Sequence, residues 1–301
     1  AALQLLPRAI RSVQYPSLVG AIHMLIAISE GMRVDARRAV KGPTYVCPGC
    51  EKAVILHKCL VKADHFQHKS EQACEWSRGE TEAHLKAKEY VQAEFERRGI
   101  RAETEYIIDT MPGDRRADVM LWTPGGSMVA IELQHTSIDP RNLAERVAAY
   151  ARVGIRQCWI PFVPDVVWKK GAATKFGWIR QGYSPRTFET WLHRMQGKNG
   201  VWMFDRRDSN FWLATLRPHT VYKEHRYYID SSGEERSSGG YEYISDSKRD
   251  LHLTGPHNLE SLMVHRLEIR AGRWAGVGWP KMRIAWLQPR PLDDHFPAPT
   301  P

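Results

Sequence analysis

The stretches Arg116-Ala-Asp-Val-Met-Leu-Trp122 and Met128-Val-Ala-Ile-Glu-Leu-Gln134 decide the fold of this 301-residue chain. A Thr-Pro-Gly-Gly turn separates these apolar segments, which is typical of a β-hairpin. If the hairpin is symmetric about Gly125, Asp118 lies directly opposite Glu132, with Cβ atoms roughly 5 Å apart. Carboxylates at this separation repel each other unless a cation neutralises them, so the hairpin predicts a site for Mg²⁺ or Mn²⁺.

Alternation along the hairpin assigns its side chains to two faces. Gln134 shares the polar face with Asp118 and Glu132. The core face is expected to hold Val119, Leu121, Val129, Ile131 and Leu133. Two acids on the solvent face of an amphipathic hairpin would give a similar pattern. The apolar neighbours of Glu132 nevertheless indicate a central strand, where an unpaired acid is costly, and this favours acids that hold a metal.

A helix is expected over residues 79–98, because this segment is rich in Ala, Glu, Lys and Leu and is followed by Gly99, a residue that commonly ends helices. Residues spaced at steps of three or four share one stripe of a helix. The stripe that we expect to face the hairpin consists of Glu80, His84, Lys88, Val91 and Phe95.

The polar part of this stripe is expected to complete the site of the hairpin. Glu80 is placed to reach the metal, and Lys88 is placed to contact a phosphate group. Glu82 takes the place of Glu80 if the helical register differs. An acid is also favourable at the positive N-terminal end of the helix dipole, which is an alternative explanation for Glu80.

Three more elements complete the expected core. Thr104–Ile108 and Gln157–Phe162 have the apolar patterns of strands, and Arg141–Arg152 has the pattern of a helix. The resulting order is α, β, β, β, α, β over residues 79–163. The expected fold class is therefore α/β, with a mixed sheet flanked by helices.

A Cys/His cluster precedes this core, within residues 41–78. A structural zinc site needs four ligands, and five candidates lie within about 30 residues: Cys47, Cys50, His65, His68 and Cys74. A redox-active dithiol is less favoured for the Cys-x-x-Cys pair, because no thioredoxin-like βαβ pattern surrounds it. Cys59 and Cys158 are expected to be ordinary buried thiols.

Two regions flank these segments. Residues 1–40 form an N-terminal segment that is expected to be β-rich from about residue 19. Residues 164–301 form an expected α+β region in which tryptophans alternate with basic residues, and this pattern suits either stacking on single-stranded DNA or an aromatic core with basic rims. Within it, Ser231–Ser247 is expected to be a mobile loop and the chain after Leu287 a Pro-rich tail.

Composition points to the partner and the compartment. The chain has 43 Lys and Arg against 34 Asp and Glu, a formal net charge of +9, which attracts polyanions such as nucleic acid. Its five cysteines do not form the pattern of a secreted disulfide framework, which favours the reducing cytoplasm. No apolar run reaches the roughly 18 to 20 residues of a membrane span, so no membrane anchor is expected.

The order and spacing of several short motifs resemble the CoiA-like proteins, a family associated with bacterial competence and carrying a predicted nuclease domain. The resemblance covers a little under half of the chain, from about Ile26 to Pro161. Its motifs are Gly31-Met-Arg-Val-Asp-Ala-Arg-Arg-Ala, Tyr45-Val-Cys-Pro-Gly-Cys, His65-Phe-Gln-His68, Gly79-Glu-Thr-x-x-His84-x-x-x-Lys88, Arg116-Ala-Asp118-Val, Ala130-Ile-Glu132-Leu-Gln134-His135, Arg146-x-x-x-Tyr150, Gly154-Ile155 and Trp159-Ile160.

The resemblance implies a restriction-endonuclease-like core of the PD-(D/E)xK type. Asp118, Glu132 and Gln134 then form a D...E-x-Q version of the catalytic signature, together with Glu80. Glutamine stands where lysine is commoner and supplies no positive charge, so Lys88 or the metal must contribute more. The residues expected to support the site are His84, Lys88, His135, Arg146 and Tyr150.

The resemblance also selects among the candidate zinc ligands. It implies a histidine and a cysteine at the positions of His68 and Cys74. The preferred set is therefore Cys47, Cys50, His68 and Cys74, with His65 as the alternative. A closed site of four ligands is expected to be structural, because a small segment with few core residues folds mainly through its metal.

These observations predict a Mg²⁺- or Mn²⁺-dependent nuclease that hydrolyses DNA phosphodiester bonds with a metal-activated water, preceded by a structural zinc module. Its expected setting is DNA processing in uptake, recombination or defence, with proteins of those processes as further partners. The alternative is a catalytically weak or inactive factor that binds DNA and recruits a partner on the same fold. The missing lysine favours this alternative.

Overall fold

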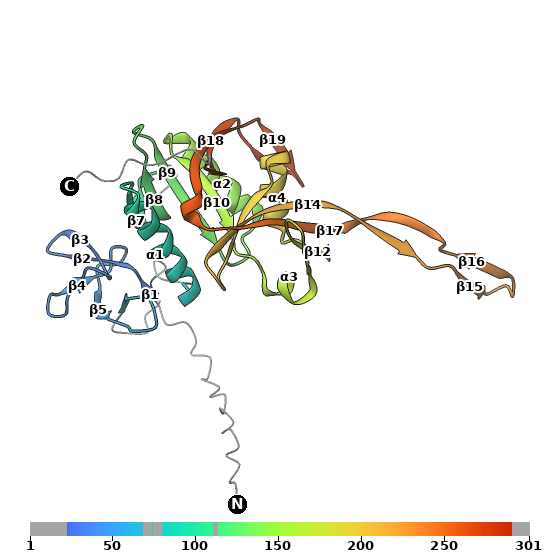
Figure 1. The fold of residues 1–301 in the computed structure, drawn as a ribbon, viewed down its shortest axis with the longest axis horizontal. Helices are drawn as coiled ribbons and strands as arrows, with labels where there is room; N and C mark the ends of the chain where they lie inside the picture. Colours follow the sequence, from blue (N-terminus) through green and yellow to red (C-terminus); the bar gives the residue numbers. More distant parts are fainter. Residues whose placement is uncertain (1–22, 69–73, 75–79, 111–113, 291–301) are drawn as a thin grey trace, which may run out of the picture. The chain divides into compact units, whose positions relative to one another are not determined.

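The computed structural model describes residues 23–68, 74, 80–110 and 114–290. These residues form two compact units (Figure 1). The first unit runs to Thr81 without Val61–Ala63, and the second contains Val61–Ala63 and the residues from Glu82 onward. Three expected features lie outside the described residues: the chain before residue 23, the helix start at Gly79 and the end of the Pro-rich tail.

The first unit is a six-stranded antiparallel sheet in the order β1-β6-β5-β4-β2-β3. Its β2–β3 hairpin turns at Glu30 and Gly31, whose φ angles of 51° and 75° are the positive values that a tight two-residue turn requires. Strands from residues 1–40 and 41–78 share this sheet, so the two segments belong to one unit. The strands are β1 (His23–Met24), β2 (Ile26–Ser29), β3 (Met32–Asp35), β4 (Tyr45–Val46), β5 (Ala53–His57) and β6 (His65–His68).

The second unit begins with the expected αβββαβ order. Its mixed four-stranded sheet has the order β10-β9-β8-β7, in which β10 is parallel to β9 and the other pairs are antiparallel. The prediction of this order is confirmed. The elements are α1 (Glu82–Arg97), β7 (Arg101–Ile108), β8 (Arg115–Trp122), β9 (Met128–Gln134), α2 (Pro140–Arg152) and β10 (Arg156–Pro161).

The hairpin register expected from the sequence is also confirmed. The observed pairs run from Val119 with Ile131 to Trp122 with Met128. The same register, continued by one residue, sets Asp118 opposite Glu132. The structure therefore supports the placement of two acids on neighbouring strands of a central hairpin.

Helix α1 begins later than the expected stripe requires. Its first residue is Glu82, and it follows Thr81, a residue type that is favourable as an N-cap. Glu80 therefore precedes the helix and does not occupy its first turn. The prediction that Glu80 continues the helical stripe of His84 and Lys88 is wrong for this reason.

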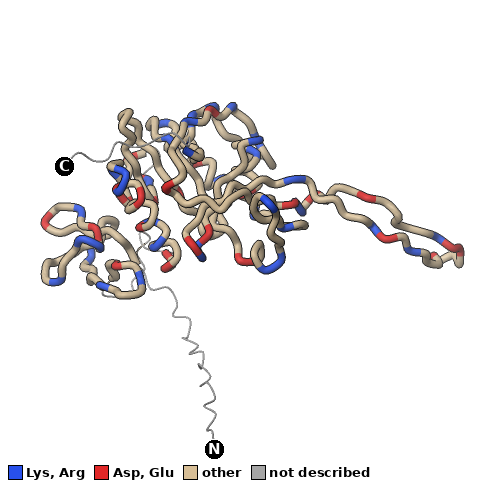
Figure 2. The backbone as a smooth tube through the Cα atoms, in the orientation of Figure 1, with Lys and Arg blue, Asp and Glu red and all other residues tan. Residues whose placement is uncertain are grey.

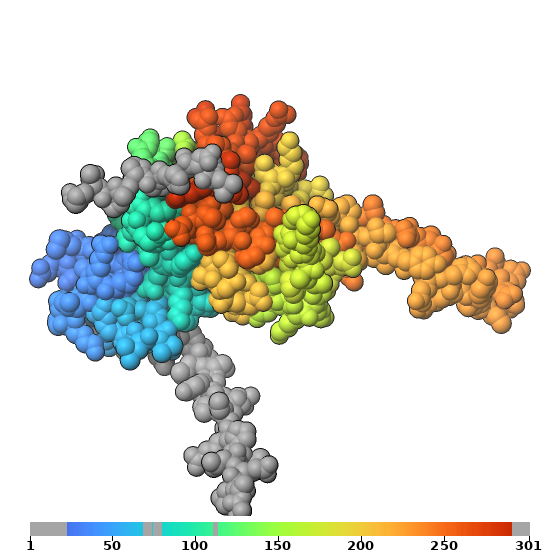
Figure 3. All heavy atoms as spheres, viewed as in Figure 1, coloured from blue at the N-terminus to red at the C-terminus, as the bar shows by residue number. Residues whose placement is uncertain are grey.

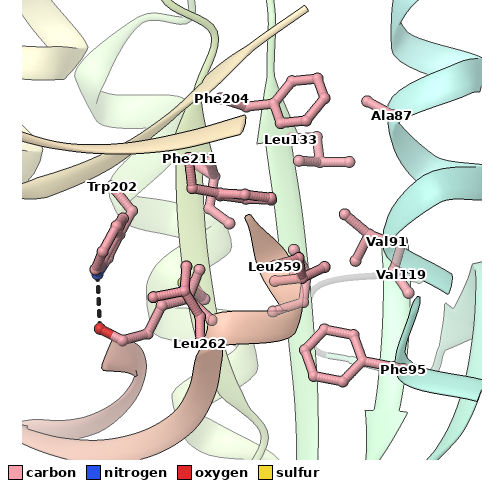
Figure 4. Close-up of a cluster of buried hydrophobic side chains, with 14 of the residues drawn as sticks. Ala87, Val91, Phe95, Val119, Leu133, Trp202, Phe204, Phe211, Leu259 and Leu262 are labelled. Atoms are coloured by element: carbon pink, nitrogen blue, oxygen red, sulfur yellow. Dashed lines mark hydrogen bonds between the residues drawn. The ribbon is translucent and has the colours of Figure 1, made fainter. Parts of the chain in front are cut away.

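Both faces of the mixed sheet are buried. One face packs Val119 and Leu133 against Val91 and Phe95 of α1 (Figure 4). On the other face Met120 and Ala130 lie in a second core cluster together with residues of α2. The expectation of a single core face is therefore wrong, because later elements of the chain cover the sheet as well.

The region after residue 163 supplies further covering elements for both faces. It contains a five-stranded sheet in the order β11-β12-β17-β14-β13 and three two-stranded ribbons. Trp202 and Phe204 of this region pack into the same core as α1 and the mixed sheet. The elements are α3 (Asp165–Lys170), β11 (Ala172–Thr174), β12 (Gly177–Tyr183), α4 (Thr187–Gln196), η2 (Gly197–Asn199), β13 (Val201–Asp205), β14 (Asn210–Lys223), β15 (Arg226–Ile229), β16 (Glu235–Ser238), β17 (Tyr241–His257), η3 (Leu259–Ser261), β18 (Leu262–Ile269), β19 (Gly272–Trp274), β20 (Val277–Trp279) and β21 (Met282–Pro289).

The tryptophans of this region favour the aromatic-core interpretation over stacking on single-stranded DNA. Trp191 and Trp202 are buried, and the indole N–H of Trp202 donates to the Leu287 carbonyl over 2.7 Å (Figure 4). The ring of Trp168 lies under the guanidinium of Arg207, with the guanidinium carbon 3.8 Å from the ring centre. An aromatic core with basic residues at its rim is therefore observed.

The prediction that Ser231–Ser247 is a mobile loop is wrong. This segment contains β16 and the start of β17, which pair with β15 and β14 in an antiparallel ribbon. The described residues as a whole are rich in strands and contain few helices, of which α1 is the longest at 16 residues. Among these residues, no helix has the length and apolar composition needed to cross a membrane.

Candidate functional site

The first unit brings the preferred Cys/His set together. The ligand atoms of Cys47, Cys50, His68 and Cys74 all lie within 4.8 Å of one another. The Cys47 and Cys74 sulfurs are 3.8 Å apart, and the Cys50 sulfur is 3.2 Å from Nε2 of His68. Three thiols and one imidazole form a donor set of the zinc-binding kind.

Local structure explains why these four side chains converge. Cys47 and Cys50 flank the turn after β4, in which the backbone N–H of Gly49 donates to the Cys47 sulfur over 3.4 Å. His68 ends β6, which β5 separates from β4 in the sheet. Burial raises the pKa of Cys47 to about 12, so a cation is needed to hold this sulfur as a thiolate near neutral pH.

The other candidates from the sequence lie apart from this group. His65 is buried, and its ring stacks on His57 with 5.0 Å between ring centres. Cys158 is a buried thiol, as expected, and burial raises its pKa to about 12. Cys59 is only half-buried, because it lies in the connection between β5 and β6.

A second candidate metal group lies at the start of the core. Ligand atoms of Glu80, His84 and Asp118 all lie within 4.8 Å of one another. The Asp118 Oδ2 atom accepts a hydrogen bond from the backbone N–H of Leu133 over 2.8 Å and lies 3.2 Å from Nε2 of His84. Only 8% of the His84 side chain and 13% of the Asp118 side chain are exposed, so these two members of the group are largely shielded from solvent.

The Glu132 carboxylate is not part of this group. It is buried, and it accepts hydrogen bonds from the guanidinium of Arg146, over 2.8 Å, and from the hydroxyl of Tyr150. Arg146 and Tyr150 lie one turn apart on α2, so the helix presents both donors to the same strand. The expected sharing of one metal by Asp118 and Glu132 does not match this arrangement.

The surroundings of Glu132 favour its protonated form. Burial raises the pKa of Glu132 to about 7, although the charge of Arg146 opposes this rise. Burial and the nearby Glu132 also raise the pKa of Tyr150 well above its ordinary value. The three side chains form a compact hydrogen-bonded cluster whose acid can change its protonation near neutral pH.

Gln134 and His135 follow Glu132 at the end of β9. The Gln134 amide donates to the Thr136 carbonyl over 2.9 Å, so it is bonded to its own loop. The His135 ring lies 4.6 Å from the ring of His84, measured between centres. His135 therefore adjoins the group of Glu80, His84 and Asp118.

Lys88 has a different environment from the one expected. Its ammonium group lies 2.8 Å from Glu105, and both side chains are fully buried. The expected contact between Lys88 and a phosphate group is therefore wrong for this structure, because solvent does not reach the ammonium group. Glu105 was not predicted from the sequence as the partner of Lys88. A lysine that shares a helix stripe with core residues nevertheless indicates that an acid lies on a neighbouring strand.

Two family models match the chain. The model of the Competence protein CoiA, nuclease-like domain, matches residues 80–224, and the model of the Competence protein CoiA, N-terminal domain, matches residues 30–77. The first match includes Glu80, His84 and Asp118, and the second includes the four residues of the Cys/His group. No curated protein matches the chain.

Replacement of Lys88 by methionine is expected to destabilise the second unit by about 3 to 5 kcal/mol, because Glu105 loses its buried opposite charge. The double variant Lys88→Met with Glu105→Met should recover most of this loss. Urea denaturation measures the free energies of unfolding. Arg283→Met is the matched control, since both side chains of its ion pair with Glu268 are 60% exposed, and it should cost less than about 1 kcal/mol. Equal losses in the single and double variants would contradict this view of the pair.

Proposed function

Since the chain belongs to the CoiA family of competence proteins, we propose that it is a metal-dependent nuclease that hydrolyses DNA phosphodiester bonds. The observation that carries this proposal is the group of Glu80, His84 and Asp118, which lies inside the region matched by the nuclease-like model. The αβββαβ order of the core and its mixed sheet support a restriction-endonuclease-like fold of the PD-(D/E)xK type.

The donor set of this group fits a divalent cation. Two carboxylates suit Mg²⁺ and Mn²⁺, whereas an imidazole shifts the preference toward transition metals. Mn²⁺ is therefore the better match for Glu80, His84 and Asp118 together. When bound, such a cation lowers the pKa of an attacking water and offsets the negative charge of the scissile phosphate.

The residues of the group differ in how firmly they are held. Asp118 is fixed by the Leu133 N–H, which orients its carboxylate before any ligand arrives. His84 is flanked by the ring of His135 and projects from the first turns of α1. Glu80 supplies the second carboxylate from the segment just before α1. This arrangement places the ligands on two secondary-structure elements and one connecting segment.

Glu132, Arg146 and Tyr150 take a different role in this proposal. Burial raises the pKa of Glu132 to about 7, toward the range that suits a general acid or base at neutral pH. Arg146 is 28% exposed, so its guanidinium can contact a DNA phosphate while it remains paired with Glu132. The net charge of +9 attracts the DNA to the protein.

One set of contacts favours a second function, a DNA-binding factor that recruits a partner without cleavage. Glu132, Gln134 and Lys88 were expected to act on the substrate, and each is engaged with another part of the protein. A site in which these contacts persist on DNA would bind without hydrolysis. The same cleavage assay separates the two functions.

The Cys/His group of the first unit has a structural role in the proposal. Cys47, Cys50, His68 and Cys74 hold one Zn²⁺, whose four ligands leave no position for a substrate. The core of this unit is small, and the largest buried side chains among its described residues are Tyr45 and Phe66. Metal binding therefore contributes a large share of the folding free energy of the unit.

Asp118→Asn is expected to lower Mn²⁺-dependent DNA cleavage roughly 100-fold, because the amide keeps the shape of the side chain but removes the charge that binds the cation. The assay uses labelled single-stranded and double-stranded DNA with Mn²⁺, with Mg²⁺ or without added metal. The matched control is Asp109→Asn, since Asp109 is an exposed acid at the end of β7. It should cleave like the wild type.

Two outcomes of this assay would count against the nuclease. Equal cleavage by the wild type and Asp118→Asn would mean that another site or a contaminant is responsible. DNA binding without cleavage by the wild type, in every metal tested, would favour the recruiting factor.

Purified protein is expected to contain about one zinc ion per chain, and Cys74→Ser should lose most of it. Amide hydrogen exchange should then show loss of protection across residues 23–68, because the unit depends on its metal. Cys59→Ser is the matched control and should retain zinc, since Cys59 lies outside the ligand group. Elemental analysis measures the metal, and equal zinc loss in both variants would refute the assigned ligand set.

A further inference from the structure

The second unit carries a long two-stranded ribbon that extends away from its body. The pairing of β14 with β17 shifts register between Pro218 and Thr220, and the ribbon beyond this shift continues into β15 and β16. We call residues Thr220–Ile244 the arm. Figure 1 shows the arm as an extended hairpin, and the space-filling view in Figure 3 shows that it stands clear of the other elements of the unit.

The arm exposes an unusual share of large apolar and aromatic side chains. Seven of the fifteen large hydrophobic residues that are exposed in the described part of the chain lie within it. A two-stranded hairpin without further packing is at best marginally stable in water, and tyrosine is enriched in protein interfaces. The seven side chains are Tyr222, Tyr227, Tyr228, Ile229, Tyr241, Tyr243 and Ile244.

The charge of the arm argues against nucleic acid as its partner. Thr220–Ile244 contains three Lys or Arg residues against five Asp or Glu residues, a net charge of −2, whereas the whole chain carries +9. The rest of the chain therefore carries +11. Figure 2 shows acidic positions at the tip of the ribbon. An acidic arm is repelled by phosphates and attracted by a basic protein surface, and the body of this chain is such a surface.

The body offers a specific place for the arm. An open groove of about 610 Å³ lies between α2 and the β19–β20 hairpin. Small residues such as Ala144, Ala148 and Gly276 line it, which leaves room for incoming side chains, and Arg273 and Trp279 lie at its wall. The segment 262–290 that surrounds the groove contains six Lys or Arg residues and one acid.

We propose that the arm docks in this groove on a second copy of the chain, so that two copies form a dimer by exchanging arms. In a dimer with a two-fold axis, the arm of each copy contacts the groove of the other copy, because each copy has both an arm and a groove. The size of the arm is adequate, since it contains 25 residues and a standard interface uses about 20 to 30 residues per side. The dimer does not depend on the proposed nuclease activity.

Sedimentation of the full-length protein over a concentration range of about 100-fold measures the dimer directly. The wild type is expected to shift from monomer to dimer within this range. Tyr227→Ser combined with Ile229→Ser should weaken the dimer at least about 10-fold, because the arm loses exposed apolar area. Phe176→Ser is the matched control, since Phe176 is 72% exposed but lies outside the arm. It should leave the dimer unchanged.

A charge exchange tests the groove. Glu234→Lys with Glu235→Lys in the arm should weaken the dimer about 10-fold, and so should Arg273→Glu in the groove with Lys281→Glu, which directly follows the lining residue Pro280. The protein with all four substitutions should recover to within about 3-fold of the wild type. A monomer at every concentration, or a dimer that the arm variants do not weaken, would overturn the proposal. Weaker DNA binding by the arm variants with an unchanged oligomeric state would also overturn it, in favour of a nucleic-acid contact.

Discussion

The antiparallel pairing of β8 with β9 is the constraint on which the rest of the second unit depends. Its register sets the Asp118 carboxylate against the backbone N–H of Leu133 and directs Glu132 toward Arg146 and Tyr150 of α2. A slip of one residue would turn every side chain of β9 to the opposite face of the sheet. Ile131 would then leave the core under α1, and Glu132 would lose both of its donors.

Burial on both faces of this sheet explains the character of its polar groups. A charge inside a protein is tolerated when an opposite charge and hydrogen bonds compensate its lost hydration. Glu105 with Lys88 and Glu132 with Arg146 meet this requirement in two separate pairs. These contacts hold several of the expected catalytic side chains. Apart from the Cys/His group, Glu80, His84 and Asp118 are the described residues whose ligand atoms lie close enough together to hold a cation.

Local signals made the hairpin and the Cys/His group predictable. The turn residues fixed the register around Gly125. The spacing of Cys and His residues gave five candidate zinc ligands, and the resemblance to the CoiA-like proteins selected Cys47, Cys50, His68 and Cys74 among them. Other features depend on residues far apart in the chain. The partner of Lys88 comes from β7, and part of the cover of each sheet face comes from beyond residue 163.

Two predictions are wrong for physical reasons that cannot be read from the composition of a segment. The Gly/Ser-rich segment 231–247 resembled a mobile loop, but cross-strand pairing with β14 and β15 orders it as a ribbon. The predicted helical stripe begins at Glu80, but α1 starts only at Glu82, after Thr81. Pairing between strands that are far apart in the sequence and the residue at which a helix begins both depend on tertiary contacts. The periodicity of a single segment carries no information about these contacts.

A crystal structure of the protein soaked in Mn²⁺ would test the central claim most directly, because the anomalous signal of manganese locates the ion without assumptions about activity. We predict a peak bonded to Glu80, His84 and Asp118, with metal–ligand distances of roughly 2.0 to 2.3 Å, separate from any signal at the Cys/His group. A peak coordinated by Glu132 without His84, or no peak near Asp118 at saturating Mn²⁺, would contradict the account.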